Sequence, residues 1–424
     1  MLYITVKYCC VKTGLIFLIG DEKLKKIISK RAPRALFYSH DTVGLGHLRR
    51  TLLLCEGLSE HIDNLSLLIV TGSAMAHAFR IPPGVDYVKL PCVTKLDNEV
   101  YKTRSLSVPF ETTLDLRREL IYQTAVSYQP DFIFVDNVPL GMKGEMVKTL
   151  EYVRAKMPNT SVFLGLRDIL DDSSHIVPLW RRTGVIEVLE KFYDRIFVYG
   201  LPAIFDPVKE YELPDSIRSK TRFCGYIPRR VDEGAAREAR RQLCPGNEKL
   251  VMVTVGGGSD GVQLVDNYLQ ASVKVHKDFK VRSLVILGPE MDSGHTKRLM
   301  SLNAADSPIR IVEYCDDPLP FMKAADLVVS MGGYNTISEI LALAKSAIVV
   351  PRVFPRQEQL IRTQRLDALG YLRMIHPDDL TPRRLADEMT DCLRAGRPEP
   401  VRKIEFSALE VLKREMYLLQ GAIL

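Results

Sequence analysis

The stretch KLVMVTVGGGSDG, residues 249–261, joins an apolar run to a glycine-rich loop. A continuous run of Leu, Val and Met is typical of a strand that is covered on both faces of a parallel sheet. Gly256, Gly258 and Gly261 then follow the spacing G-x-G-x-x-G, which lets a backbone approach a phosphate at a helix N-terminus. The stretch therefore predicts a strand, a phosphate-binding loop and a helix of an α/β domain.

The same order of elements repeats along the chain. Short apolar runs alternate with helical segments such as 46–60 and 111–128, which predicts parallel, doubly wound sheets. A chain of 424 residues is too long for one ordinary core, so we expect two domains. The predicted strands are 35–39, 65–72, 85–90, 131–136, 161–166 and 195–200, followed by 249–256, 283–288, 309–314, 326–332 and 346–351.

The segment 222–249 interrupts this order with Pro228, a charged helix and the pair Pro245–Gly246. We interpret it as a domain boundary, so that two Rossmann-like domains face each other across a cleft. The predicted parts are a variable extension at 1–30, a first domain at 31–225, a hinge at 226–248, a second, nucleotide-binding domain at 249–400, and a closing helix within 401–424.

The composition narrows the class of protein. The net charge of +6 suits anionic small molecules and permits a peripheral membrane contact, but it lacks the dense basic stripe of a nucleic-acid binder. The eight cysteines form no C-x-x-C pair and are interpreted as reduced thiols of a cytoplasmic protein without zinc. Five arginine pairs, including Arg49–Arg50 and Arg117–Arg118, are expected to lie mostly on solvated helix faces.

The stretch VVSMGGYNTISEILALA, residues 328–344, again ends a strand in glycines, here Gly332–Gly333, and starts a helix near Asn335. Thr336 and Glu339 form the capping-box spacing T-x-x-E. Glu339 therefore either caps the helix or accepts hydrogen bonds from the two hydroxyls of a ribose. The spacing does not separate these readings, but a capping box needs no glycines, so we favour the ribose.

Two further strand ends carry polar residues. After residue 349, Arg352, Arg356 and Glu358 precede Gln359, whose amide could contact a ribose, while Arg362 and Arg365 are expected to be solvated. In the loop after 309–314, backbone groups near Cys315 could read a nucleobase, and the pair Asp316–Asp317 favours a helix cap over a metal pair. The sequence contains no D-x-D motif, so a metal-dependent sugar-nucleotide site of that kind is not expected.

The first predicted strand leads into SHDTVGLGHLRRT, residues 39–51. Gly44 and Gly46 allow a tight turn, and His47 stands at the start of the following helix. The loop could be a phosphate cradle, could carry a catalytic base, or could be an ordinary corner. Arg49 occupies the place of the third glycine of a dinucleotide loop, which argues against the nicotinamide type.

Taken together, the G-x-G-H opening, GGGSDG, GGYNTISE and PRQEQ resemble GT-B glycosyltransferases of family 28, which include the bacterial peptidoglycan N-acetylglucosaminyltransferase. The resemblance is strong over 249–375 and local over 35–55. An uncharacterised bacterial group of predicted glycosyltransferases shares the style of the opening. The resemblance implies a GT-B fold, a UDP-linked sugar donor, no cofactor, a glycan, lipid or small-molecule acceptor, and a role in cell-envelope or polysaccharide synthesis at or near the inner face of the membrane.

The resemblance also implies roles for individual residues. The loop of the second domain faces the donor diphosphate, the backbone near Cys315 meets the base, and Glu339 holds the ribose. Gln359 contacts the ribose or the sugar. The implied donor-binding residues are Gly44, Gly46, Arg229, Gly256, Gly257, Gly258, Ser259, Cys315, Gly332, Gly333, Asn335, Thr336, Glu339 and Gln359.

For the reaction we expect an inverting transfer with His47 as the base, because histidine titrates near neutral pH. Helix N-termini and Arg229 or Arg230 could stabilise the leaving diphosphate without a metal. A nucleotide-sugar hydrolase, an epimerase of the same fold and a sugar-nucleotide sensor without turnover remain alternatives.

Overall fold

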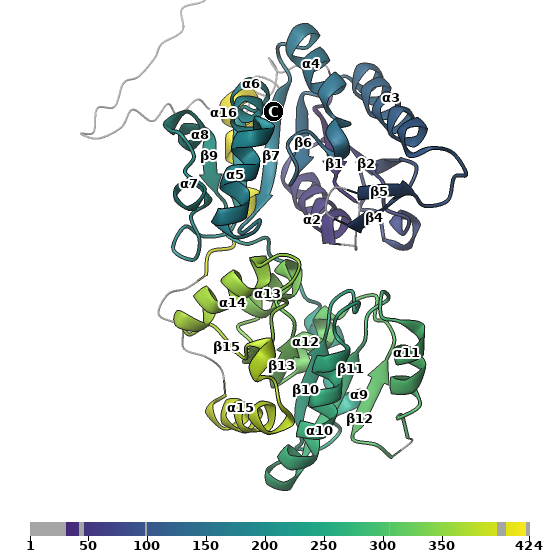
Figure 1. Ribbon diagram of the computed structural model, residues 1–424, viewed down its shortest axis with the longest axis vertical. Helices are drawn as coiled ribbons and strands as arrows, with labels where there is room; N and C mark the ends of the chain where they lie inside the picture. The colour runs from purple at the N-terminus through teal and green to yellow at the C-terminus, as the bar shows by residue number, and fades with distance from the viewer. Residues whose placement is uncertain (1–30, 42–45, 98–99, 305, 397–403, 421–424) are drawn as a thin grey trace, which may run out of the picture.

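The computed structural model describes residues 31–41, 46–97, 100–304, 306–396 and 404–420. Two parallel sheets lie one above the other, each with helices on both faces (Figure 1). The predicted extension at 1–30 lies outside the described residues.

The first sheet has seven strands in the order β3-β2-β1-β6-β7-β8-β9, and all neighbouring strands run parallel. The six strands predicted in this half are confirmed. The apolar runs of five of them are largely buried between two helical layers, whereas the edge strand β3 is only partly buried. The short edge strand β9 was not predicted, since three residues carry no periodic signal. The bounds are β1 Arg34–Ser39, β2 Ser66–Thr71, β3 Val85–Lys89, β6 Phe132–Asp136, β7 Ser161–Arg167, β8 Arg195–Tyr199 and β9 Thr221–Phe223.

Helices α2 and α3 confirm the two helical segments predicted in this half. A hairpin of β4 and β5 adds an antiparallel pair that was not predicted. The bounds are α2 Gly46–His61, α3 Phe110–Tyr128, α4 Val147–Lys156, α5 Ser173–Thr183, α6 Val185–Phe192, α7 Pro207–Glu210, α8 Asp215–Lys220, β4 Val93–Asp97 and β5 Val100–Thr103.

The second sheet has six parallel strands in the order β12-β11-β10-β13-β14-β15. Its five predicted strands are confirmed, and the two-residue strand β15 was not predicted. The bounds are β10 Lys249–Thr254, β11 Val281–Ile286, β12 Ile309–Val312, β13 Leu327–Ser330, β14 Ala347–Val349, β15 Arg373–Met374, α9 Glu233–Leu243, α10 Val262–Asp278, α11 Ser293–Met300, α12 Leu319–Ala324, α13 Tyr334–Ala342, α14 Glu358–Ala368 and α15 Pro382–Ala395.

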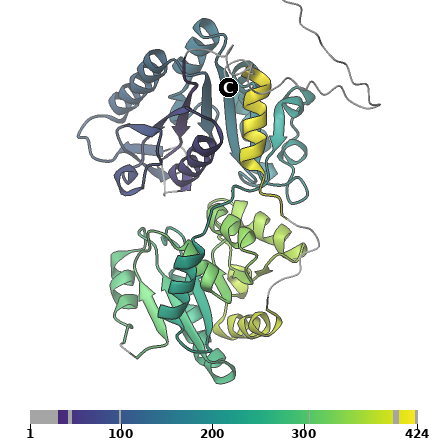
Figure 2. The same cartoon turned by 180° about the vertical axis from the view of Figure 1, so that it is seen from behind.

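The chain passes between the two halves twice. Helix α9, inside the predicted hinge, packs against α12 of the second half. The last helix, α16 (Ala408–Gln420), returns to the first half and packs on α2, as the yellow helix in Figure 2 shows. Its Glu415 carboxylate pairs with Arg195 at 2.6 Å and with Arg222 at 3.0 Å.

The two halves are joined through a buried arginine. Arg362 of α14 forms an ion pair with Asp168, which follows β7 of the first half, at 2.7 Å. Its Nη1 also donates to the Gly332 carbonyl at 3.0 Å, and Tyr226 donates to Asp168 at 3.2 Å. The prediction of a solvated Arg362 is therefore wrong: local periodicity could not show that a carboxylate from the other half meets this side chain.

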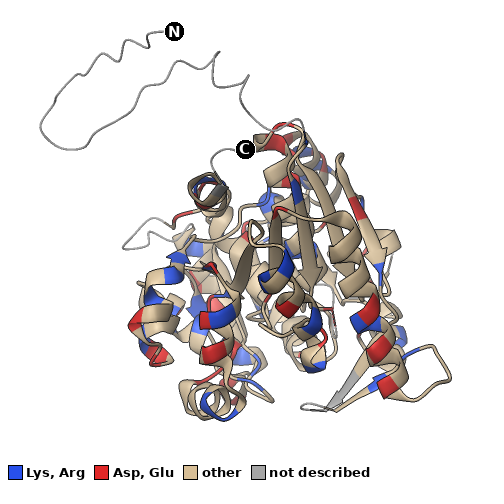
Figure 3. Ribbon diagram, turned by 90° about the horizontal axis from the view of Figure 1, so that it is seen from above, with Lys and Arg blue, Asp and Glu red and all other residues tan. Residues whose placement is uncertain are grey.

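Two members of the arginine pairs, Arg50 and Arg117, are exceptions to the solvated helix faces expected for most of them. Arg50 pairs with Asp136 at 2.5 Å, and Arg117 pairs with Glu145 at 2.6 Å, and all four side chains are buried or nearly so. Elsewhere, basic residues (blue) and acidic residues (red) are interspersed along the ribbon seen from above (Figure 3), which fits the modest net charge. No helix among the described residues is long and apolar enough to cross a membrane.

Candidate active site

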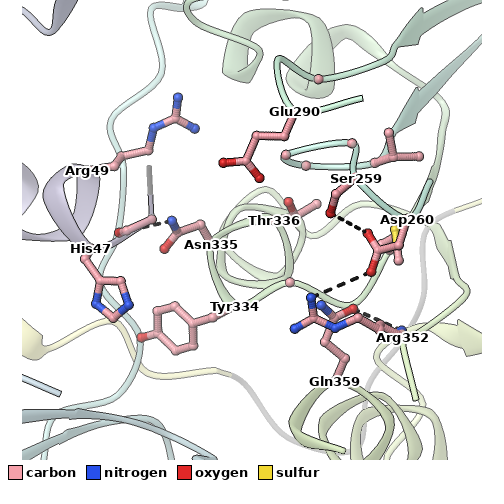
Figure 4. A pocket seen from close by; sticks show the side chains of 18 of the residues that line it. His47, Arg49, Ser259, Asp260, Glu290, Tyr334, Asn335, Thr336, Arg352 and Gln359 are labelled. Carbon is pink, nitrogen blue, oxygen red and sulfur yellow. Dashed lines mark hydrogen bonds and ion pairs between the residues drawn. The ribbon is translucent and has the colours of Figure 1, made fainter. Parts of the chain in front are cut away.

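A cavity of about 710 Å³ lies between the two sheets. Its walls come from segments that follow the carboxyl ends of strands in both halves, including β1, β6 and β7 of the first and β10, β13 and β14 of the second. Ligands of doubly wound sheets bind at this edge, because there the loops and helix N-termini converge. The cavity is therefore the candidate active site (Figure 4).

His47, in the first turn of α2, forms a pair with Asp136 at the end of β6. The Nδ1 atom of His47 lies 2.5 Å from Oδ2 of Asp136. A carboxylate that close accepts, so Nδ1 carries the proton and Nε2 is left to take up a proton from a ligand. Arg50 Nη2 also lies 3.1 Å from Nδ1, but two donors cannot bond each other, so we read this as a contact alone.

Asp136 is held ionised by its neighbours. Burial opposes its charge, but the positive charges of Arg50 and His47 outweigh that effect and hold the pKa of Asp136 well below its usual range. Arg50 contributes two hydrogen bonds to Asp136 Oδ1, at 2.5 and 3.1 Å. The guanidinium of Arg50 also lies over the ring of Tyr334, which comes from the second half.

His40 stands beside this pair and also lines the cavity. Its ring meets the ring of His47 edge-on, with centroids 5.7 Å apart. Burial, followed by the nearby charge of His47, lowers the pKa of His40 to about 3. His40 is therefore neutral in the physiological pH range. The carboxylate of Asp136 pairs with His47 and with Arg50.

The glycine loop after β10 forms the facing wall. Gly256 and Gly258 have φ of 65° and 97°, and a Cβ on Gly258 would lie 2.3 Å from the Leu287 carbonyl oxygen. These glycines are required by the turn itself. Helix α10 then begins after Gly261 with no acidic residue in its first turn and, among the described residues, no side chain bonded to its N-terminal N–H groups. Its positive end is open to an anion.

Helix α13 presents a second open N-terminus. It begins at Tyr334 with Gly333 as its cap, and within the described structure no side chain bonds its first N–H groups. The capping-box alternative for Glu339 is therefore wrong, because the helix starts earlier than the T-x-x-E spacing assumed. Glu339 instead accepts from Arg229 at 2.6 Å. Asn335 reaches across the cavity and donates to the Gly46 carbonyl at 3.4 Å.

A third polar cluster follows β14. The backbone N–H of Arg352 donates to Gln359 Oε1 at 3.1 Å, and the side chain of Arg352 bonds Glu358 at 3.0 Å. Asp260, from the glycine loop, lies 3.6 Å from Arg352 on the other side. Oε2 of Glu358 is buried with no hydrogen-bond partner in the described structure.

Most of the residues implied by the resemblance meet at this cavity. Arg229 stands behind the wall, where it pairs with Glu339 and with Asp317 at 2.8 Å. Gly332 packs against α14, since a Cβ there would lie 2.8 Å from the Thr363 hydroxyl. Gly44 lies outside the described residues. Those that line the cavity are Gly46, His47, Gly256, Gly257, Gly258, Ser259, Cys315, Gly333, Asn335, Thr336, Glu339 and Gln359.

Sequence reasoning missed the partners on the wall of the first half. Asp136 ends β6, Asn137 follows it, and Arg167 ends β7, which are positions at the ligand-binding edge of the sheet. A polar residue directly after a buried strand was an available signal. No spacing rule, however, connects Asp136 to His47, which stands 89 positions earlier.

Comparison with known proteins agrees with the resemblance of the second half to glycosyltransferases of family 28. Residues 251–411 match the glycosyltransferase family 28 C-terminal domain. The second half of the chain is similar to this domain over the matched residues. The matched stretch supplies the glycine loop, α13 and the Arg352 cluster of the cavity.

Two relatives in sequence illustrate the match. The UDP-N-acetylglucosamine–N-acetylmuramyl-(pentapeptide) pyrophosphoryl-undecaprenol N-acetylglucosamine transferase of Proteus mirabilis is 29% identical over 160 residues, which are 37% of this chain and 44% of that protein. An uncharacterised glycosyltransferase of Methanopyrus kandleri is 24% identical over 210 residues, 49% of this chain and 56% of that protein. The chain thus spans about half the length of these relatives.

Solved structures extend the likeness to the whole fold. The structure of MurG from Acinetobacter baumannii covers 92% of this chain and 99% of its own, with a TM-score of 0.52 at 13% identity. At that identity the likeness concerns the fold alone. The predicted GT-B architecture of two Rossmann-like domains is confirmed.

Proposed function

We propose that this protein transfers a sugar from a UDP-linked donor to an acceptor hydroxyl, with inversion at the anomeric carbon and without a metal ion. One observation carries the proposal: a His47–Asp136 pair on one wall of a cavity faces the glycine loop that leads into α10 and the open N-terminus of α13 on the other. A proton acceptor thus lies opposite a site that can bind a diphosphate. Transfer from a nucleotide sugar needs both a base for the acceptor hydroxyl and stabilisation of the leaving diphosphate.

The second domain would bind the donor. The N-terminus of α10 and the loop Gly256–Ser259 face the diphosphate, and α13 faces the phosphate or sugar with Asn335 and Thr336. Glu339, oriented by Arg229, accepts from the ribose hydroxyls. Gln359 and its neighbours around Arg352 meet the sugar, and backbone groups near Cys315 meet the base.

The first domain would supply the nucleophile. The acceptor hydroxyl oxygen forms a bond to the anomeric carbon while the bond from that carbon to the diphosphate oxygen breaks. Nε2 of His47 takes the hydroxyl proton, and Asp136 stabilises the imidazolium that results. The diphosphate leaves with the bonding electrons and is stabilised by the helix N-termini. The acceptor is a glycan, a lipid or a small molecule, and a lipid acceptor would require peripheral contact with a membrane.

The test begins with a donor screen by thermal shift, since ligands of the folded state raise its stability. UDP release is then followed with and without candidate acceptors. The variant His47→Ala is expected to bind UDP like the wild type but to lose turnover by about 10²-fold or more. His61→Ala, at the opposite end of α2, is the matched control and should change neither.

Four outcomes would contradict the proposal. Rapid UDP release without acceptor indicates a hydrolase, and isomerisation of the donor without UDP release indicates an epimerase. Binding of UDP-sugars without turnover in the presence of acceptor mixtures indicates a sensor. Loss of activity in a chelator, restored by a divalent cation, would refute the metal-free mechanism.

A further inference from the structure

Arg167, at the end of β7, is a cavity-lining arginine without a counterion. Its Nε donates to Asn137 Oδ1 over a long 3.4 Å, and no carboxylate of a described residue forms an ion pair with it. The three buried arginines Arg50, Arg117 and Arg362 each have such a carboxylate. Arg167 thus presents an uncompensated charge to the cavity.

The surroundings of Arg167 raise the positive potential further. Burial, and then the charge of Arg50, lowers the pKa of Arg167 to about 10, and Arg356 acts in the same direction. Glu358 is the carboxylate that opposes this effect, but it is hydrogen-bonded to Arg352. A cation that nearby charges destabilise gains most from an anion brought by a ligand.

Asn137 completes the arrangement. It has φ of 65°, a left-handed conformation that asparagine adopts more readily than most residues, and its N–H donates to the Gly165 carbonyl at 2.8 Å. This fixes Asn137 at the cavity beside Arg167 on the neighbouring strand. Asn137 also directly follows Asp136, the partner of His47, so a ligand held here lies next to the proposed base.

We propose that Arg167 and Asn137 bind an oxyanion, a phosphate or a carboxylate, that the sugar acceptor carries close to its reacting hydroxyl. The inference rests on the proposed glycosyl transfer. The donor diphosphate has its own helix N-termini in the second domain, whereas Arg167 belongs to the opposite wall. The subsite therefore selects anionic acceptors over neutral ones of the same shape.

The test measures binding of inorganic phosphate, and separately of acetate, by calorimetry in the presence of saturating UDP. We expect the wild type to bind at least one of these anions, which also identifies the class of oxyanion. Arg167→Gln should weaken that binding about tenfold or more, because a charge-assisted hydrogen bond is lost. Arg182→Gln, on the exposed face of α5, is the matched control and should bind like the wild type.

Asn137→Gly provides a second variant, since glycine tolerates the same φ and removes only the side-chain amide. It should weaken anion binding while the unfolding midpoint without ligand stays close to that of the wild type. Unchanged anion binding in both variants would overturn the inference. So would anion binding that UDP abolishes, because Arg167 would then serve the donor. Failure of UDP itself to bind would instead overturn the proposed function.

Discussion

At the scale of single residues, the wall of the first domain combines three titratable groups with separate tasks. Asp136 stays ionised, His47 is free to take up a proton, and His40 is kept neutral by burial. Burial and neighbouring charges thus fix the charge states of Asp136 and His40, whereas geometry alone assigns the role of His47.

His40 makes stability depend on pH. Its folded pKa of about 3 lies below the usual 6.5, so the unfolded state binds more protons between these values and stability falls as the pH drops through this window. At pH 5 the protonation of His40 in the unfolded state lowers the free energy of unfolding by about 2 kcal/mol. The free energy of unfolding, measured with urea at pH 7.5 and at pH 5, should therefore decrease less in His40→Gln than in the wild type, by about 2 kcal/mol. Equal losses would mean that His40 is protonated in the folded protein.

Asp136→Asn should reduce turnover by about 10²-fold or more, because an amide can favour the wrong tautomer of His47 and cannot stabilise its charged form. Arg50 is also left without its carboxylate, which should cost about 3–5 kcal/mol of unfolding free energy. Steady-state kinetics and urea unfolding measure the two effects, with the exposed Asp215→Asn as control. Full activity in Asp136→Asn would refute the role of the pair.

At the scale of elements, the loop before α10 depends on Gly258. A Cβ there would overlap the Leu287 carbonyl oxygen, and alanine is strained at a φ of 97°. Gly370 has φ of 74° with no atom within 4 Å of an added Cβ, so Gly370→Ala isolates the backbone strain. Gly370→Ala should cost about 1–2 kcal/mol. Gly258→Ala should cost more and weaken UDP binding, as unfolding and calorimetry would show; equal costs would contradict the steric argument.

The elements were largely predictable because most strands are continuous apolar runs that parallel sheets bury on both faces. The glycine loops were predictable for a similar reason, since a tight turn before a helix restricts the residue types. The edge strand β9 and the β4–β5 hairpin were not, because they are short or partly exposed. The partners of Arg362, Arg50 and Glu339 lie far away in sequence, and only the folded chain brings them together.

At the scale of the whole molecule, the buried ion pair of Asp168 and Arg362 joins the two domains. Asp168→Asn leaves an uncompensated charge and should cost about 3–5 kcal/mol. The exposed pair of Arg365 and Glu210 also lies between α14 and the first domain, so Arg365→Gln is the matched control and should cost less than about 1 kcal/mol. Urea unfolding measures both, and small-angle scattering should show a wider separation of the domains in Asp168→Asn. Similar costs would mean that the buried pair is not the main junction.

The return of α16 to the first domain also governs the order in which a growing chain can finish folding. The surface of α2 around Gly57, against which Leu409 packs, has no cover while the intervening second domain is being made. The ribosome adds the roughly 200 residues between β9 and the end of α16 at about 5–20 residues per second, so this interval lasts about 10–40 s. The first domain is therefore completed last. During synthesis, the surface of α2 that α16 will cover stays exposed, and a chaperone could bind it there.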